Sequence, residues 1–166
     1  PPSLVQLIVN FIEPKQGIVH DPACGSGGMF IQTAQFINDK VKKSINESIS
    51  VYGTELKTNN TKLAKMNLAI HGLEGKIIED NSFYSDPHKL VNKCNFIMAN
   101  PPFNVKKVDK KKDYVINDPR LPFGLPNNDN GNYMWIQYFH SYLNKNGRAG
   151  LSYPVCCSSC CFSGST

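Results

Sequence analysis

The chain has 166 residues, of which 40% are hydrophobic and 19% are charged, a balance typical of a globular domain and not of a disordered chain. Its longest apolar stretch, Leu4 to Ile12, contains Gln6 and Asn10 and is too short to cross a bilayer. Most of the net charge of +5 lies in residues 100–166, which hold eight basic and four acidic residues. This excess favours a polyanionic partner, although a solvated surface loop produces the same pattern.

The hydrophobic pattern alternates between helix and strand along the chain. It predicts a helix over Ser3–Ile12, a strand over Ile18–Asp21, a helix over Gly28–Lys43, a strand over Ile49–Thr54 and a helix over Thr58–His71. Two further strands follow at Lys76–Glu79 and Asn95–Ala99, the second nearly all apolar, as a central parallel strand should be. A helix over Asn132–Leu143, a stop at Asn144–Gly147 and a strand over Arg148–Tyr153 complete the order. These elements predict an α/β fold with a doubly wound, mostly parallel sheet.

Two segments depart from this alternation. Residues 100–130 form a long irregular stretch with five prolines, and a loop of that length is uncommon unless it serves recognition or chemistry. Residues 154–166 form a Cys-rich tail whose four thiols crowd into six positions, so we expect no metal site there. The predicted domain is therefore residues 1–153. Within it, Cys24 and Cys94 stand alone and are typical of small core residues.

The turn after the first strand runs Asp21-Pro22-Ala23-Cys24-Gly25-Ser26-Gly27-Gly28. In open α/β sheets, ligands bind outside the carboxyl ends of the strands, where glycines let the backbone approach them. Gly25 and Gly27 match the first half of the dinucleotide pattern G-x-G-x-x-G, but Phe30 occupies the third glycine position. The turn therefore disfavours a pyrophosphate cofactor, and Asp21 instead suits a ligand with a positively charged amino group.

Acidic residues also follow the next two strands. Glu55 comes just after the second strand, where a carboxylate can accept both hydroxyls of a ribose. Asp80 comes just after the third, placed to meet the exocyclic amine of an adenine. Any one of these acids could be only a helix cap or a turn residue, but three behind a glycine turn match an ammonium group, a ribose and an adenine. We therefore expect S-adenosylmethionine as the cofactor.

The sequence Asn100-Pro101-Pro102-Phe103 follows the apolar fourth strand directly. Two prolines fix φ and remove N–H groups, so they form a stiff corner that an ordinary strand exit does not need. The amide oxygen of Asn100, the carbonyl of Pro101 and the ring of Phe103 together suit a planar ring that bears an NH2 group. We expect the two oxygens to hold the amino hydrogens while Phe103 stacks on the ring. The alternative is a rigid loop with a core phenylalanine.

The pair DPACGSGG and NPPF, about 80 residues apart, resembles the amino-methylating DNA methyltransferases. Within them the chain most resembles the modification subunit of type I restriction–modification systems. Three stretches carry that likeness: Glu55-Leu56 with Leu63–Leu68, Asn100–Asn104, and Asp118-Pro119-Arg120 with Pro122-Phe123-Gly124. The resemblance covers about residues 1 to 150. It implies a Rossmann-like, S-adenosylmethionine-dependent methyltransferase fold and methyl transfer to N6 of adenine in DNA.

The resemblance also implies roles for individual residues. Glu55 would hold the cofactor's ribose and Asp80 its adenine, and the corner of Asn100, Pro101, Pro102 and Phe103 would hold the target adenine. The rest of the cofactor site would be Asp21, Ala23, Gly25, Ser26 and Gly27. The basic residues that could grip DNA phosphates while the target base flips out are Lys106, Lys107, Lys110, Lys111 and Lys112.

Two departures from the family accompany this resemblance. The chain starts at Pro1-Pro2, within or just after the family's Tyr/Phe-Thr-Pro motif, and it ends after about the fifth strand, so we expect a fragment that covers the catalytic core. In the family a specificity subunit reads the DNA and a restriction subunit completes the complex. We therefore expect DNA and these two subunits as partners, a cytoplasmic location and no membrane.

Other functions remain open at the level of sequence. A different NPP[FY] amino-methyltransferase could act on guanine N2 of RNA or on a protein glutamine, because those targets also carry a planar NH2 group. The lysine-rich residues 106–112, here called the basic loop, argue against a protein substrate. The motif DPACGSGG favours adenine in DNA as the substrate. A non-catalytic scaffold that keeps the fold for assembly is the third possibility, but the intact NPPF and acidic residues argue against it.

Overall fold

The structure is a computed structural model that describes residues 2–41, 44–103, 105, 108–126 and 131–152. Five parallel strands form one sheet in the order β3-β2-β1-β4-β5. Their bounds are Gly17–Asp21 (β1), Ile49–Glu55 (β2), Gly75–Glu79 (β3), Cys94–Ala99 (β4) and Leu143–Leu151 (β5). The order reverses beside β1, which pairs with β2 on one side and β4 on the other. The predicted doubly wound parallel sheet is confirmed.

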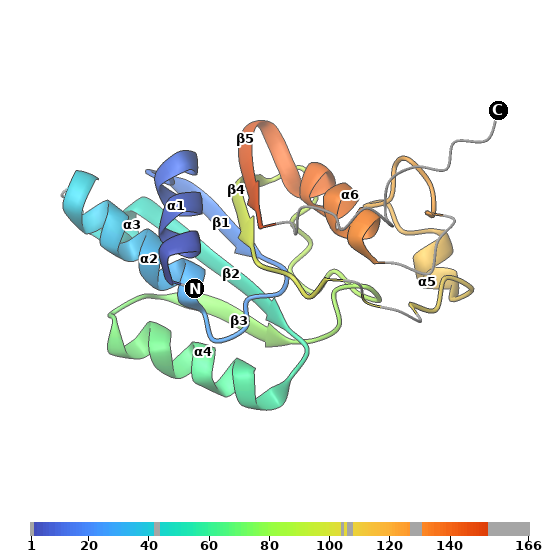
Figure 1. The fold of residues 1–166 in the computed structure, drawn as a ribbon, viewed down its shortest axis with the longest axis horizontal. Helices are drawn as coiled ribbons and strands as arrows, with labels where there is room; N and C mark the ends of the chain where they lie inside the picture. The colour runs from blue at the N-terminus through green and yellow to red at the C-terminus, as the bar shows by residue number, and fades with distance from the viewer. Residues whose placement is uncertain (1, 42–43, 104, 106–107, 127–130, 153–166) are drawn as a thin grey trace.

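Helices cover both faces of the sheet (Figure 1). They are α1 (Pro2–Ile12), α2 (Gly28–Phe36) with its π-helical extension η1 (Ile37–Val41), α3 (Ile45–Ser48), α4 (Thr58–Ile70), α5 (Asp113–Ile116) and α6 (Asn132–Tyr142). One apolar core joins α1, α2 and α4 to the sheet, and a second joins α6 to the opposite face. The period of two along β4 explains the split, because Met98 lies in the first core while Ile97 and Ala99 lie in the second.

Several predicted boundaries were wrong. The helix expected over Gly28–Lys43 becomes π-helical at Ile37, and its last two residues lie outside the described part of the chain. Short helical turns, α3 and α5, occur where the sequence predicted no element. Neither has the length that makes a hydrophobic period detectable.

The last strand also begins earlier than predicted. Leu143 already pairs with Cys94, whereas the next paired residue of β5, Arg148, lies opposite Phe96. The expected stop at residues 144–147 therefore forms a bulge inside the strand, where the N–H of Asn146 donates to Oδ1 of Asn144 at 3.0 Å. The helix does end just before these residues, at Tyr142, but they belong to the strand that pairs with β4 and do not precede it. Among the described residues, no helix is long and apolar enough to cross a membrane.

Candidate active site

A cavity of about 370 Å³ opens at the carboxyl ends of β1, β2, β3 and β4. Parallel strands bring their carboxyl ends to one edge of the sheet, so residues from four distant stretches of sequence meet there. The lining residues are Pro22, Ala23, Gly25, Glu55, Leu56, Lys57, Asn60, Asp80, Asn81, Ser82, Phe83, Asn100, Pro102, Val105 and Trp135. The residues predicted to bind the ribose (Glu55), the adenine of the cofactor (Asp80) and the target amine (Asn100) thus line one cavity.

The glycine turn provides the floor of this cavity. Gly25 and Gly27 have positive φ values of 55° and 82°, which side-chain-bearing residues rarely adopt. A Cβ on Gly27 would lie 3.2 Å from Leu68 Cδ1, so this glycine allows α4 to approach the turn. A Cβ on Gly25 would meet no atom of the described structure within 4 Å, because Gly25 faces the open cavity. The turn therefore leaves room for a ligand close to its backbone.

Glu55 fastens the glycine turn to the end of β2. Its Oε2 accepts the N–H of Gly25 at 3.0 Å, and its Oε1 accepts the N–H of Lys57 at 2.9 Å and the Nδ2 of Asn60 at 3.3 Å. A carboxylate offers about four acceptor positions, so one remains for a ligand hydroxyl. Glu55 lines the cavity although its side chain is largely buried. It is both a clamp on the turn and a candidate ribose ligand.

Asp21 lies beneath the turn and does not line the cavity in the described part of the chain. It is 2% exposed, and one of its oxygens accepts the N–H of Ala23 at 2.9 Å. Burial raises the pKa of Asp21 to about 8; the bond from Ala23 opposes this rise and the Glu55 carboxylate adds to it. A cationic group above the turn would favour the ionised form. Of the other predicted turn residues, Ala23 lines the cavity, whereas Ser26 and Gly27 do not.

The loop after β3 forms one wall of the cavity, here called the adenine-side wall because the sequence predicts that Asp80 meets the adenine of the cofactor. The N–H of Asp80 donates to the Glu55 carbonyl at 3.0 Å, and Oδ1 of Asp80 accepts the N–H of Asn81 at 2.7 Å. Phe83 packs on Trp135 from α6, with ring centroids 4.6 Å apart. Asp80 and two aromatic rings therefore line the same cavity, a combination that suits a flat base with an amino group.

The corner after β4 closes the opposite side. Asn100 and Pro102 line the cavity and are exposed, whereas Pro101 is buried and Phe103 is half-buried away from it. Oδ1 of Asn100, the acceptor expected from the sequence, already receives a hydrogen bond from Oγ of Ser152 at the end of β5. An amide oxygen has two lone pairs, so a second donor can still bind it.

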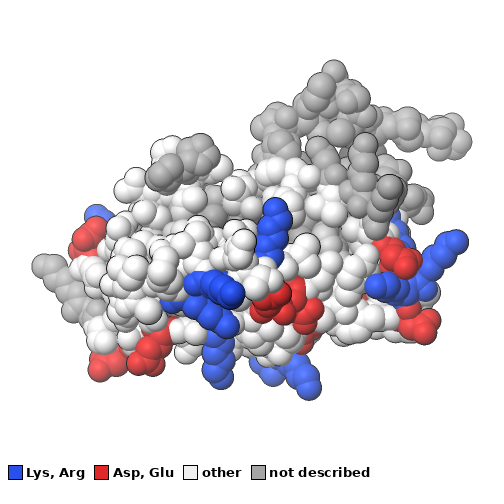
Figure 2. All heavy atoms as spheres, turned by 90° about the horizontal axis from the view of Figure 1, so that it is seen from below, with Lys and Arg blue, Asp and Glu red and all other residues white. Residues whose placement is uncertain are grey.

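The basic loop folds back on the loop after β3. The N–H of Asp109 donates to the Tyr84 hydroxyl at 2.9 Å, and Nζ of Lys112 lies 4.2 Å from the centre of the Tyr84 ring. Nζ of Lys110 donates to the Pro126 carbonyl at 2.8 Å, while Lys111 is exposed. Lys106 and Lys107 lie outside the described residues. On the face shown in Figure 2, basic and acidic side chains are interspersed.

Sequence reasoning missed several residues of the site, including Phe83 of the wall described above. Trp135 and Asn60 line the cavity, Ser152 binds Asn100, and Nδ2 of Asn67 donates to the Ser26 carbonyl at 2.9 Å. Asn67 lies in the stretch Leu63–Leu68 that carried part of the family resemblance, so a signal for it existed without a role. The Cys-rich tail lies outside the described residues.

Comparison with known proteins adds independent findings. The sequence model of the N-6 DNA Methylase family matches residues 1–166. The type I restriction enzyme HindI methylase subunit of Haemophilus influenzae is 41% identical over 154 residues, which are 91% of this chain and 33% of that protein. The MjaIX methylase subunit of Methanocaldococcus jannaschii is 40% identical over 156 residues, 91% of this chain and 27% of that protein. The chain thus spans a third or less of the length of these relatives.

Solved structures show the same fold. A type I restriction-modification system methyltransferase subunit from Streptococcus thermophilus superimposes with a TM-score of 0.71 and 22% identity, over 90% of this chain and 32% of that one. The type I restriction enzyme EcoKI M protein gives a TM-score of 0.67 and 23% identity, over 91% of this chain and 32% of that one.

Proposed function

The chain belongs to the N-6 DNA methylase family, and from this premise we propose that it is the catalytic core of an adenine-specific DNA methyltransferase. The proposed reaction moves a methyl group from S-adenosylmethionine to N6 of an adenine in DNA. The proposed setting is the modification subunit of a type I restriction–modification system, which the names of the relatives at 41% and 40% identity support.

One observation carries the proposal. Gly25, Glu55 and Asp80, expected to hold the cofactor, line the same cavity as Asn100, expected to hold the amine. Methyl transfer needs donor and acceptor side by side, and alignment of two reactants is itself a large part of catalysis. A scaffold that had lost the reaction would not need both halves in one cavity.

Three features of the cavity fit the cofactor. Open space lies in front of Gly25, Glu55 keeps an acceptor position, and Asp80 stands beside Phe83 and Trp135. In our proposal Glu55 accepts one ribose hydroxyl, Asp80 accepts from the adenine amine, and Asp21 stabilises the amino group of the cofactor from beneath the turn. When bound, S-adenosylmethionine would supply a methyl group already activated by its sulfonium.

The protein's task at the acceptor is to orient and polarise the N6 amine. Oδ1 of Asn100 accepts one amino hydrogen, and the Pro101 carbonyl would accept the other after a rearrangement of the corner, because Pro101 is buried and does not line the cavity in the described structure. These two bonds direct the nitrogen lone pair at the methyl carbon. As the N–C bond forms, the methyl–sulfur bond would break, and the neutral thioether would leave with the electron pair of that bond. The nitrogen would then release one proton to water beside the exposed Asn100. Phe103 would stack on the flipped base after a rearrangement, because its ring does not line the cavity.

A cysteine nucleophile has no part in this scheme. Cys24 is the cysteine nearest the cavity floor among the described residues, and it is buried. Burial raises the pKa of the Cys24 thiol above its ordinary range, and the nearby carboxyl groups of Asp21 and Glu55 raise it further. A protonated thiol is a poor nucleophile, whereas N6 carries its own lone pair.

DNA, a specificity subunit and a restriction subunit are the proposed partners, and a cytoplasmic location belongs to the same proposal. The test is transfer of a tritiated methyl group to DNA by the full-length protein assembled with its specificity subunit. Label recovered as N6-methyladenine at a defined site supports the proposal. Cofactor binding without methyl transfer would favour a scaffold, and label in RNA or protein would favour a different amino-methyltransferase.

A further inference from the structure

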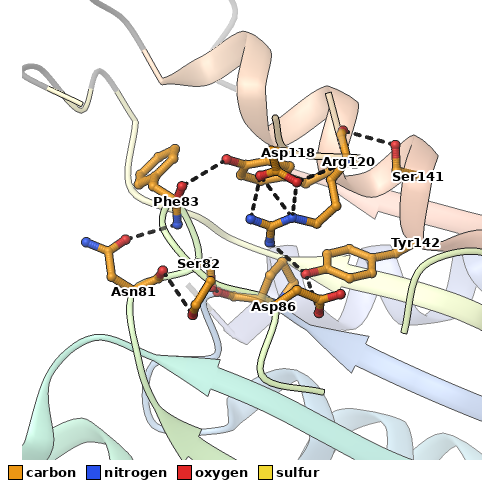
Figure 3. A network of polar contacts seen from close by, with 11 residues as sticks. Asn81, Ser82, Phe83, Asp86, Asp118, Arg120, Ser141 and Tyr142 are labelled. Atoms are coloured by element: carbon orange, nitrogen blue, oxygen red, sulfur yellow. Dashed lines mark hydrogen bonds and ion pairs between the residues drawn. The ribbon is translucent and has the colours of Figure 1, made fainter. Parts of the chain in front are cut away.

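A fully buried arginine lies at the centre of a polar network beside the cavity (Figure 3). Arg120 is 0% exposed, and its guanidinium forms a forked ion pair with Asp118, with Nη2 to Oδ2 at 2.7 Å and Nε to Oδ1 at 2.9 Å. Its carbon Cζ lies 4.2 Å from the centre of the Tyr138 ring. Burial opposes the charge, but the bonds to Asp118 raise the pKa of Arg120 above its ordinary value.

The network joins three segments that are distant in sequence. Nη1 of Arg120 donates to the Tyr142 hydroxyl at 2.8 Å, and that hydroxyl donates to Oδ1 of Asp86 at 3.1 Å. Tyr142 belongs to α6, whereas Asp86 belongs to the loop after β3 (Figure 3). Tyr142 therefore connects the buried ion pair to the loop after β3 through two hydrogen bonds.

That loop is also the adenine-side wall of the cavity. Asn81, Ser82 and Phe83 line the cavity, and Asp86 follows three residues after Phe83. The Tyr138 hydroxyl lies 3.5 Å from the Phe83 carbonyl, which gives α6 a second, longer contact with the same wall. Neither Tyr142 nor Arg120 lines the cavity in the described part of the chain. Their connection to the wall is indirect.

We infer that Tyr142 is a positioning residue that uses the buried Arg120–Asp118 pair as an anchor and holds Asp86, and with it the adenine-side wall, in a binding geometry. The inference rests on the proposed function insofar as the wall binds the adenine of the cofactor. The buried ion pair does not itself require the bond from the Tyr142 hydroxyl to Asp86, because Asp118 already neutralises the guanidinium of Arg120.

Two matched hydroxyl deletions separate positioning from packing. Tyr142→Phe keeps the ring and removes both the acceptor for Arg120 and the donor to Asp86. Ser141→Ala removes the bond from Ser141 Oγ to the Arg120 carbonyl, 3.0 Å long and equally buried, which does not reach the wall. Both variants should lower the melting temperature. Only Tyr142→Phe should loosen the wall.

The first readout needs no cofactor. The sequence contains one tryptophan, Trp135, which packs on Phe83 in the wall, so acrylamide quenching of the full chain reports how tightly the wall is closed. Quenching should increase in Tyr142→Phe and remain at the wild-type level in Ser141→Ala. Equal quenching of both variants and wild type would overturn the inference, whatever the chain binds.

The second readout is calorimetric binding of S-adenosylmethionine to the assembled full-length protein. Tyr142→Phe should weaken binding about fivefold, the effect of one net hydrogen bond, and Ser141→Ala should change it less than twofold. Asp86→Ala should add little to Tyr142→Phe, since both break the bond from the Tyr142 hydroxyl to residue 86. If Tyr142→Phe increases quenching but the wild-type protein binds no S-adenosylmethionine, the proposed function is refuted and the positioning role of Tyr142 is retained. If the wild type binds S-adenosylmethionine and Tyr142→Phe binds it with the same affinity, only the inference about Tyr142 is refuted.

Discussion

Oδ1 of Asn100 accepts a hydrogen bond from Oγ of Ser152, so the end of β5 fixes the side chain of the corner that follows β4. This bond restrains the amide of Asn100, which lines the cavity. With the oxygen held by Ser152 through one lone pair, the second lone pair is available to an amino hydrogen. The orientation of Asn100 is thus set by a residue 52 positions away.

This relationship predicts a measurable role for the hydroxyl. Ser152→Ala should reduce the single-turnover methylation rate roughly five- to tenfold, because the amide of Asn100 then samples orientations that present its NH2 group to the target. Cofactor affinity should stay at the wild-type value. Ser152→Thr, which keeps the hydroxyl, is the matched control and should retain most of the rate. A Ser152→Ala protein as fast as wild type would show that the bond has no catalytic consequence.

The glycine turn should depend on Asn67. Its Nδ2 supports the Ser26 carbonyl from α4, so Asn67→Ala should weaken S-adenosylmethionine binding by about 1 kcal/mol through a less ordered turn. Lys65→Ala, an exposed change on the same helix, serves as the control and should leave binding unchanged. Calorimetric titration of both variants checks this, and equal affinities would remove Asn67 from the account.

The pH dependence of stability should carry the signature of Asp21. Its pKa is raised from an ordinary value of 3.8 to about 8 in the folded protein, so between these values the folded state binds the proton more tightly than the unfolded state. The contribution of Asp21 is therefore fully present below pH 3.8 and is lost as pH rises toward about 8. Asp21→Asn should remove this loss, and its stability relative to wild type should increase steadily with pH in that window.

The measurement is urea unfolding of both proteins at several pH values. His20 should produce an opposite slope in both, since burial lowers its pKa from 6.5 to about 3 and stability falls as pH drops through that range. The difference between the two proteins cancels the His20 slope. A difference that does not change with pH would mean that Asp21 titrates normally.

The described lysines of the basic loop should contribute unequally to DNA binding. Lys111 is exposed, whereas Lys110 and Lys112 have intramolecular contacts with Pro126 and Tyr84. Lys111→Ser should reduce the slope of log affinity against log salt by about 0.9 if it contacts one phosphate. Sequence preference should not change, because a phosphate contact reads no base. An unaltered salt slope would identify Lys111 as a solvated side chain.

The convergence of Gly25, Glu55, Asp80 and Asn100 could be predicted from the sequence because each lies at or after the carboxyl end of a strand of the same parallel sheet. A strand's hydrophobic run and the polar residue after it are local signals, and the topology does the rest. Those four residues indeed line one cavity. What local signals could not show was that Asp21 is buried and does not line the cavity of the described structure, because burial is set by tertiary packing.

The supporting contacts could not be predicted for a related reason. Asn67 to Ser26 spans 41 positions and Ser152 to Asn100 spans 52, and no periodicity links such pairs. The ion pair of Arg120 with Asp118 is local, but its burial under α6 is a tertiary fact. Arginine is almost never fully buried without a partner, so composition alone would have placed Arg120 on the surface.

In the proposed reaction, the corner after β4 holds the reacting N6 amine. Asn100→Ala removes one of its two acceptors, and Asn100→Asp keeps an acceptor oxygen in its place. The measurement is single-turnover methyl transfer to DNA by the assembled full-length enzyme, with S-adenosylmethionine affinity determined in parallel. We expect Asn100→Ala to lower the methylation rate by a factor on the order of a hundred or more. Asn100→Asp should retain a larger share of the wild-type rate, and the affinity for S-adenosylmethionine should barely change in either variant. Methylation by Asn100→Ala at the wild-type rate would contradict the account, because the corner would then be structural and the adenine assignment would lose its basis.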